Sequence, residues 1–176
     1  MRKNLIFFLM ILATMFVQIA ITQLLPVIMV TPNLLLALAA SFGFMRGRHA
    51  GVLIGFVSGI LADVFIGGGL FGMHALVYAY IGFICGFFSK KYFDDDLKMP
   101  LLLIGVSDLV FGAIVYIIEA ILHRGLNFPL YFGRTILPEA VATVLVSILL
   151  YRLYHWISVK VTAREIEEQN SPWLRG

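Results

Sequence analysis

Residues 5–45 decide the fold class, because they contain no charged side chain: LIFFLMILATMFVQIAITQLLPVIMVTPNLLLALAASFGFM. As one helix, these 41 residues would be about 60 Å long, twice the hydrocarbon thickness of a bilayer. Pro26 and Pro32 interrupt the run, since each removes a backbone donor and disfavours helical geometry in the residue before it. We therefore predict two membrane spans, at about 5–25 and 32–45. The second is short, which leaves open a small tilt, an extension toward its N-terminal side, or a partly re-entrant course.

The composition of the whole chain agrees with a membrane protein. Of its 176 residues, 61% are hydrophobic and only 23 are charged (13 Lys+Arg plus 10 Asp+Glu), and the mean hydropathy is +0.96. A soluble domain has about a quarter of its residues charged, so this chain lacks the polar residues needed to cover a globule in water. Six spans of about 20 residues each would use about 120 residues. These numbers exclude a soluble enzyme and leave no room for a separate catalytic domain outside the membrane.

Charged residues mark the ends of four further apolar segments. Together with the first two, they give six predicted spans, at about 5–25, 32–45, 49–66, 70–89, 99–122 and 134–157. We therefore expect an all-α integral membrane protein, a six-transmembrane-helix bundle within residues 1–160, followed by a cytoplasmic tail over 161–176. The tail is polar, and we expect it to be short and mobile rather than a domain.

The distribution of basic residues predicts the orientation of the bundle. Eleven of the 13 Lys and Arg residues fall on the side that holds both termini, which the positive-inside rule places in the cytoplasm. The basic flanks of the inner loops could meet anionic lipid head groups or a cytoplasmic partner. These flanks are Arg46, Arg48, Lys90 and Lys91. The basic residues form no stripe interleaved with aromatic residues, so the pattern does not indicate nucleic-acid binding.

Two predicted spans carry small residues at helical spacing. The third span and its start contain Gly47, Gly51, Gly55 and Gly59 at strict four-residue intervals, and the fourth contains Ala75, Ala79, Gly82 and Gly86. Such stripes let helix backbones approach closely. Because a Gly-rich hairpin at 67–69 joins the two spans, they can pack against each other as antiparallel neighbours. The alternative is that the stripe docks the helix of a partner.

Several polar residues are expected at one level, near the outer ends of the spans. The carboxylates are Asp63, Glu119 and Glu139, and the cationic or titratable residues predicted at similar depth are His74, His123, Arg124 and Arg134. Ionisable groups at membrane depth are expensive unless they are paired or hydrated, so we expect a network of acids with Arg and His at this outer level. We place Glu139 in the first turn of the last span, beside Pro138, where a helix N-terminus favours an acid.

Asp108 lies about nine residues into the fifth span, close to the membrane midplane. No Lys or Arg is predicted at that depth, so we expect Asp108 to be protonated, hydrogen-bonded to a hydroxyl, or satisfied by a partner subunit. A structural role and a proton-relay or ion-site role both remain open. We find no phosphate loop, zinc pair or nucleophile elbow, and predict no catalytic residue, cofactor or metal. Cys85, the single cysteine, is expected to be a small buried apolar residue.

Several local patterns together resemble the MreD family of bacterial rod shape-determining membrane proteins. They are the segment 32–36 (PNLLL), Arg46-Gly47 followed by the glycine stripe and Asp63, and the segment 67–76 (GGGLFGMHAL) continuing to Tyr78 and Gly82. Their order and spacing cover about residues 5–157. Asn33 stands where the family often has Asp, which removes a charge and weakens any role assigned to that position.

This resemblance implies a non-enzymatic component of the cell-elongation machinery in the bacterial inner membrane. It implies direct binding of MreC and a link between MreB filaments and peptidoglycan synthesis by RodA and its class B penicillin-binding protein. It also implies a fold similar to the S components of energy-coupling factor transporters. A substrate-binding S-type subunit of a small-molecule transporter is therefore the alternative function, although the first span lacks the Ala-x-x-x-Ala face that such subunits use.

Overall fold

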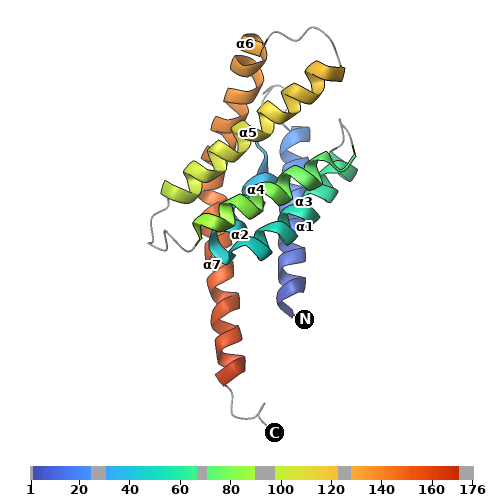
Figure 1. Ribbon diagram of the computed structural model, residues 1–176. Helices are drawn as coiled ribbons and strands as arrows, with labels where there is room; N and C mark the ends of the chain where they lie inside the picture. Colours follow the sequence, from blue (N-terminus) through green and yellow to red (C-terminus); the bar gives the residue numbers. More distant parts are fainter. Residues whose placement is uncertain (1, 25–30, 67–70, 90–97, 123–127, 171–176) are drawn as a thin grey trace.

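The computed structural model describes residues 2–24, 31–66, 71–89, 98–122 and 128–170, and the regular structure in these ranges is entirely helical (Figure 1). In chain order the elements are α1 (Arg2–Leu24), α2 (Leu34–Arg46), α3 (Arg48–Phe65), α4 (Met73–Phe88), α5 (Lys98–Leu122), α6 (Phe128–Tyr131), the π-helix η1 (Phe132–Ile136) and α7 (Leu137–Asn170). A helix thus lies over each of the six segments that the sequence predicts.

Four helical stretches are long and apolar enough to cross a membrane by length and composition. They are Leu5–Gln23 in α1, Arg48–Phe65 in α3, Lys98–Ile121 in α5 and Phe128–Lys160 in α6 to α7. Helices α2 and α4 are apolar but shorter. The described part of the chain is therefore a helical membrane protein with four candidate spans and two shorter apolar helices.

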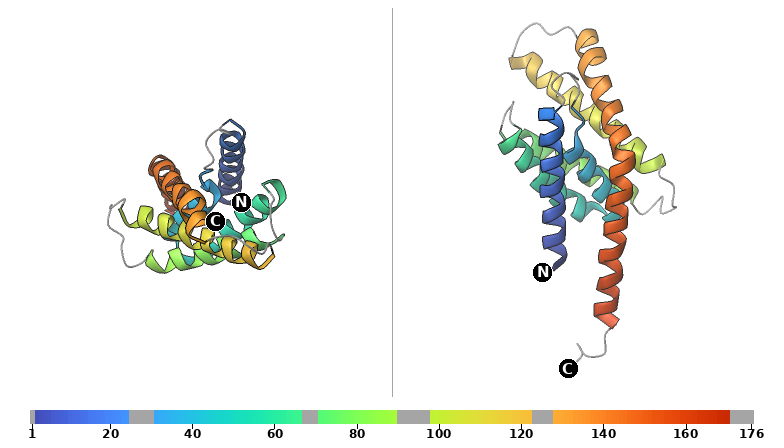
Figure 2. Two further views of the ribbon diagram at one scale, coloured as in Figure 1. Left: turned by 90° about the horizontal axis from the view of Figure 1, so that it is seen from above. Right: turned by 180° about the vertical axis from the view of Figure 1, so that it is seen from behind.

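The helices form two differently oriented groups (Figures 1 and 2). Helices α1 and α7 run in opposite directions, so that the beginning of α1 and the end of α7 lie at the same end of the molecule. The antiparallel pair α3 and α4 lies steeply inclined to α1, and α5 is inclined in a similar way as it crosses α7. Helix α2 contacts α1, α3, α4, α5 and α7, and so occupies the centre of the bundle.

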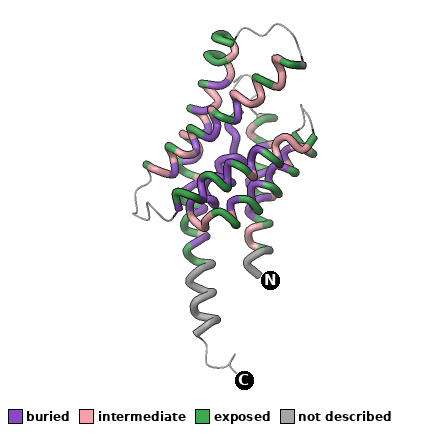
Figure 3. The backbone as a smooth tube through the Cα atoms, in the orientation of Figure 1, coloured by how far each residue is buried: buried purple, intermediate pink, exposed green. Residues whose placement is uncertain are grey.

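The core is built around α2. Residues 34–44 are buried, and Leu34, Leu35, Leu36 and Leu38 have no exposed surface. Figure 3 shows the buried tube concentrated where α2, α3 and α4 meet, with exposed segments on the outward sides of the outer helices. Many of those exposed side chains are large and apolar. This is the arrangement of a helix that is hydrophobic all round inside a bundle whose outer surface faces lipid.

The last helical run begins earlier than the sequence prediction of about 134. It starts at Phe128, passes through η1, and continues as α7, so Glu139 is not at a free helix N-terminus. Pro138 cannot donate a backbone hydrogen bond and would clash in a regular α-helix. The wider π-turn directly before it, in which the Leu137 N–H bonds the Phe132 carbonyl, accommodates this. The run continues at its other end to Asn170, so the predicted tail from residue 161 begins as helix.

Candidate functional site: the polar centre and a lateral groove

The start of α2 is held by a central polar network, which we define as Gln18, Asn33, Tyr78 and Thr143. The Asn33 backbone N–H donates to Thr143 Oγ1 at 2.9 Å, and the Tyr78 hydroxyl donates to Asn33 Oδ1 at 2.7 Å. Asn33, Tyr78 and Thr143 are all buried. Asn33, the residue directly before α2, therefore forms hydrogen bonds with both α4 and α7 in the middle of an apolar bundle.

The same network satisfies the first backbone N–H groups of α2. Asn33 Oδ1 also accepts the Leu36 N–H at 3.3 Å, as an N-cap, and Gln18 Oε1 on α1 accepts the Leu35 N–H at 3.1 Å. Free N–H groups at a buried helix start are costly unless they are capped. Asn33 can cap with a neutral amide where an aspartate would bring a charge. The network thus makes it possible for α2 to begin inside the bundle.

A second polar cluster closes the α3–α4 hairpin at Asp63. Its carboxylate accepts the backbone N–H groups of Gly72 at 3.0 Å, His74 at 3.3 Å and Ala75 at 3.1 Å, and lies 2.8 Å from His74 Nδ1. Asp63 therefore caps the N-terminus of α4 from the end of α3, where the helix dipole also favours an acid. Gly72 precedes α4 with φ +94°, a conformation that side chains rarely adopt.

The predicted small-residue stripes meet each other inside the bundle. A Cβ atom at Gly51, Gly55 or Gly59 would collide with the α4 backbone, at Gly82, Tyr78 and Ala75 respectively. On α4, Gly86 faces the backbone at Gly47 and Arg48, and Ala79 contributes its Cα to the contact with Gly55. Gly43 on α2 adds a third backbone, because it meets Gly82 as well. The stripe is therefore occupied by contacts within this chain.

The other polar residues that the sequence predicts near the outer ends of the spans do not form one network. Glu119 faces Tyr131 and is half-buried, whereas Arg134 is exposed and forms no ion pair with the described residues. Arg124 and His123 lie outside the described residues. Of the expected outer network, the structure brings Asp63 and His74 together and leaves Arg134 apart from them.

The predicted basic flanks differ in their surroundings. Arg46 donates from Nε to Ser158 Oγ at 3.0 Å and from Nη2 to the Ser158 carbonyl at 3.1 Å, and its guanidinium lies 4.6 Å from the Phe7 ring centroid. Arg48 is exposed with its guanidinium 4.4 Å from the centroid of Phe87. Arg46 thus joins the end of α2 to α1 and α7. Lys90 and Lys91 lie outside the described residues.

Asp108 is 3% exposed, and neither of its carboxyl oxygens has a hydrogen-bond partner among the described residues. The Thr143 hydroxyl is close enough to interact with this carboxyl, but it lacks the geometry of a hydrogen bond. The second acid, Glu139, lies near enough to feel the charge of Asp108. Two carboxyls, one from α5 and one from α7, therefore lie within electrostatic range of each other beside the central polar network.

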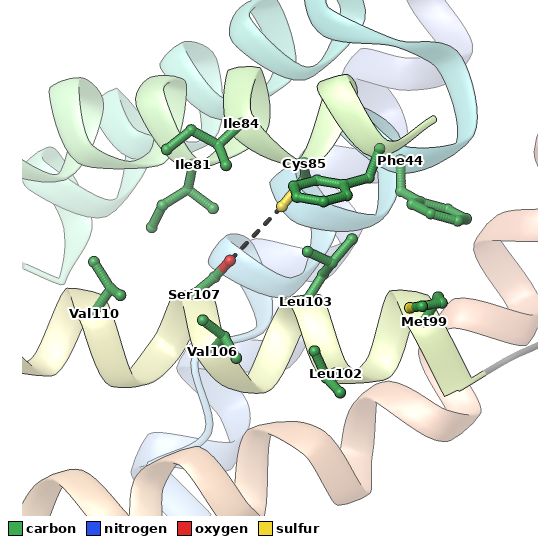
Figure 4. Close-up of a pocket in the computed structure, with 11 residues that line it drawn as sticks. Phe44, Ile81, Ile84, Cys85, Met99, Leu102, Leu103, Val106, Ser107 and Val110 are labelled. Carbon is green, nitrogen blue, oxygen red and sulfur yellow. Dashed lines mark hydrogen bonds between the residues drawn. The ribbon is translucent and has the colours of Figure 1, made fainter. Parts of the chain in front are cut away.

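A groove of about 450 Å³ opens between α4 and α5, which scarcely touch (Figure 4). Figure 4 shows Cys85 and Ser107 facing each other across it, with Sγ and Oγ 3.7 Å apart. The other lining side chains are apolar: Phe44, Ile81, Ile84, Phe88, Met99, Leu102, Leu103, Val106 and Val110. Such a lining suits an acyl chain or an apolar helix. In the described part of the chain, no group of three or more His, Cys, Asp or Glu side chains could hold a metal ion.

Sequence reasoning missed Gln18, Gly43, Tyr78 as a hydrogen-bond donor, and Thr143. Gln18 and Thr143 could have been found, because each is an isolated polar residue in a long apolar run, and such residues in a membrane protein usually have a specific polar contact. Gly43 extends the four-residue glycine spacing one step toward the N-terminus, but it belongs to α2 and not to α3. The sequence pattern could therefore have marked these residues as unusual. It could not have predicted their contacts, which join helices far apart in sequence.

Comparison with known proteins gives one match. A family model described as MreD, rod shape-determining protein MreD, matches residues 1–157. Neither the search of curated proteins nor the search of solved structures found a match. The matched range includes every contact given so far except the one between Arg46 and Ser158, a residue of α7 just beyond the match. The chain therefore belongs to the MreD family of rod shape-determining membrane proteins.

Proposed function

We propose that this protein is a non-enzymatic scaffold of the bacterial elongation machinery in the inner membrane. In this role it binds MreC and links MreB filaments to peptidoglycan synthesis by RodA and its class B penicillin-binding protein. The observation that carries the proposal is the family match over residues 1–157, which includes nearly all of the helical bundle. The polar side chains of the centre support it, because their described contacts hold helices together.

The partner surface in this proposal is an outer face of the bundle and not the glycine stripe. The stripe is buried between α2, α3 and α4, so it has no room for a further helix. The apolar groove between α4 and α5 is open and could seat the membrane helix of MreC. Arg134 is exposed near the start of the last helical run and could meet the segment of MreC next to the membrane.

We further propose six membrane passes with both termini in the cytoplasm. The contact of Arg46 with Phe7 and Ser158 supports this, because it puts the α2–α3 junction level with the first turns of α1 and with the end of the predicted span 134–157 in α7. All three positions would then lie on the cytoplasmic side, where basic residues concentrate. Reporter fusions at Gly68 and Asn127 should report the outside, and fusions at His49 and Asp95 the cytoplasm. An inverted result at either pair would refute this topology.

Complementation of cell shape tests the scaffold role. Cells depleted of their MreD are expected to round up, and expression of this chain in its own host should restore rods. A matched variant, Leu102→Arg, places a charge in the groove about one turn from the start of α5 at Lys98. The long arginine side chain can reach the membrane surface from there, so the fold should tolerate it. We expect this variant to accumulate normally and to fail in restoring rods. The control Leu153→Arg, exposed on α7 outside the groove and near the cytoplasmic end of the predicted span, should restore them. Rods with both variants would exclude the groove as the partner surface.

An S-type transporter subunit would need convergent polar groups around a small ligand. The four side chains of the central polar network instead bond to α2 and to one another, and the groove lining is almost entirely apolar. The two functions predict different co-purifying proteins: MreC for the scaffold, and a pair of ATPases for the transporter subunit.

A further inference from the structure

The register of α5 against α7 places Asp108 opposite a polar stretch of α7. Gly105 on α5 packs against Val144, and Gly112 packs against Ile136, so the two helices run antiparallel. Asp108 lies between these two glycines and therefore faces the segment between Ile136 and Val144. That segment contains Glu139 and Thr143, one helical turn apart on the same face.

Several buried polar atoms where α5 packs against α7 have no hydrogen-bond partner among the described residues. Both Asp108 oxygens are buried and unpartnered among the described residues, and so is Ser147 Oγ, one turn beyond Thr143 on α7. Thr143 Oγ1 already accepts the N–H of Asn33. Buried polar atoms in native proteins are nearly always partnered, and each exception calls for an explanation.

No cation of the described protein neutralises this site. The groups that face it are Glu139 from α7, Asn33 from the start of α2, and Tyr78 from α4, whose hydroxyl is committed to Asn33. His74, next along α4, is paired with Asp63. The exposed Arg134 and the distant Arg46 contact other groups or solvent. The buried Asp108 and the half-buried Glu139 thus lie near each other in apolar surroundings, without a positive charge from the described residues.

An isolated ionised carboxylate in such an interior is prohibitively unfavourable, and two adjacent ones repel each other as well. We propose that Asp108 and Glu139 form a site for one monovalent cation of the medium, a proton or a sodium ion, bound between α5 and α7 beside Thr143. The bound charge holds α5 against α7 and so stabilises the closed bundle. This site does not depend on the scaffold role, because Asp108 is buried and Glu139 is only partly exposed.

Thermal unfolding of the purified full-length protein in detergent tests the proposal. Unfolding midpoints are measured across a pH series in sodium chloride and in choline chloride at equal ionic strength, for wild type, Asp108→Asn and Glu119→Gln. Glu119→Gln is the matched control, because it neutralises an acid that lies away from this pair. A bound ion stabilises the folded state by mass action, so its loss lowers the midpoint.

Two results support the site and identify its ion. If sodium binds, sodium chloride raises the wild-type midpoint over choline chloride at alkaline pH, and Asp108→Asn removes the difference. If a proton binds, the two salts give equal midpoints that fall as pH rises, and Asp108→Asn flattens this fall while Glu119→Gln retains it. The proposal is overturned if Asp108→Asn responds to pH and to sodium exactly as wild type does.

Infrared spectroscopy of the wild-type protein keeps the proposal testable should Asp108→Asn fail to fold. Biosynthetic ¹³C labelling of aspartate side chains identifies their carboxyl bands. We expect an aspartate band of a protonated acid that persists at neutral pH, or a carboxylate band that shifts when sodium replaces choline. Labelled aspartate bands that show neither behaviour would contradict the proposal.

Discussion

The α3–α4 hairpin and the α5–α7 pair pack in opposite ways. In the hairpin, glycines bring backbone against backbone, and a Cβ at Gly55 would strike the Tyr78 carbonyl. Between α5 and the last helical run, a Cβ at Gly105 would meet only the Val144 side chain, 2.9 Å from its Cγ2. A Cβ at Gly112 would meet only the side chain of Ile136 in η1, 2.9 Å from its Cγ2. The hairpin is closed by the carboxylate of Asp63, which accepts several hydrogen bonds, whereas the α5–α7 pair encloses the carboxyl of Asp108, which has no partner among the described residues.

This difference separates a rigid part of the bundle from an adaptable one. Backbone contacts cannot adjust by changing a rotamer, so the hairpin has one arrangement and forms, with α2, the fixed centre. Helix α5 packs through side chains, borders an open groove and carries unpartnered polar atoms. We therefore expect its position to change more easily when a partner or an ion binds. Substitutions in the two regions should therefore differ in their effect on stability.

Adding one methyl group to a glycine should cost more stability in the α3–α4 hairpin than in the α5–α7 pair. Gly55→Ala should destabilise the protein by about 3 kcal/mol, because the methyl group meets backbone that cannot move aside. Gly105→Ala should cost about 1 kcal/mol, since the Val144 methyl can give way. Gly133→Ala is the control, with no atom near its Cβ. Unfolding midpoints in detergent measure all three, and equal losses at Gly55 and Gly105 would remove the distinction.

The Asp63 cap tests how far the hairpin depends on its closure. Asp63→Ala removes the acceptor of three backbone N–H groups and of the His74 ring, and it should destabilise the fold by about 2 kcal/mol. Glu119→Ala should have a much smaller effect, because Glu119 caps no helix. Hydrogen exchange at Gly72 and Ala75 should rise in Asp63→Ala alone. Unchanged protection at these amides would show that the cap is dispensable.

The Tyr78 hydroxyl tests the link between the hairpin and α2. Tyr78→Phe keeps the ring, which packs 5.4 Å from that of Phe111, and removes only the bond to Asn33. We expect a loss of about 1 kcal/mol in the free energy of unfolding. Tyr80→Phe on the same helix, whose side chain is 63% exposed, should be neutral. Equal effects of the two substitutions would argue against the central polar network.

The groove should show the smallest effect. Leu102→Ala changes a side chain that lines an open space, and stability should change by less than about 0.5 kcal/mol. Ile104→Ala, two residues along α5 and fully buried, should cost about 3 kcal/mol. Comparable losses at both positions in denaturation experiments would mean that the groove is filled by the fold itself.

The sequence predicts the helices far better than it predicts the contacts between them. Long apolar runs and their punctuation by charge, Gly and Pro determine where helices form, so the six segments coincide with helices. Pro138 misleads because a π-turn, which periodicity does not reveal, lets a helix run through it. The polar run after residue 161 is helical to Asn170 because it continues a helix that is already formed.

The polar sites divide in the same way. Asp63 and His74 are brought together by a short hairpin, so their proximity follows from nearness in sequence. The bond between Asn33 and Thr143 joins residues 110 positions apart, and nothing in the local pattern of either segment specifies it. Asp108 is identified by its isolation in an apolar run, but its neighbour Glu139 depends on the register of α5 against α7.

The central claim, that this chain is an elongation scaffold and not a transporter subunit, is tested most directly by affinity purification of the tagged protein from its native membranes in mild detergent. The scaffold account predicts that MreC is recovered in stoichiometric amount, and that RodA, its penicillin-binding partner or MreB is enriched over an untagged control. Recovery of a pair of ATPases without MreC would contradict it.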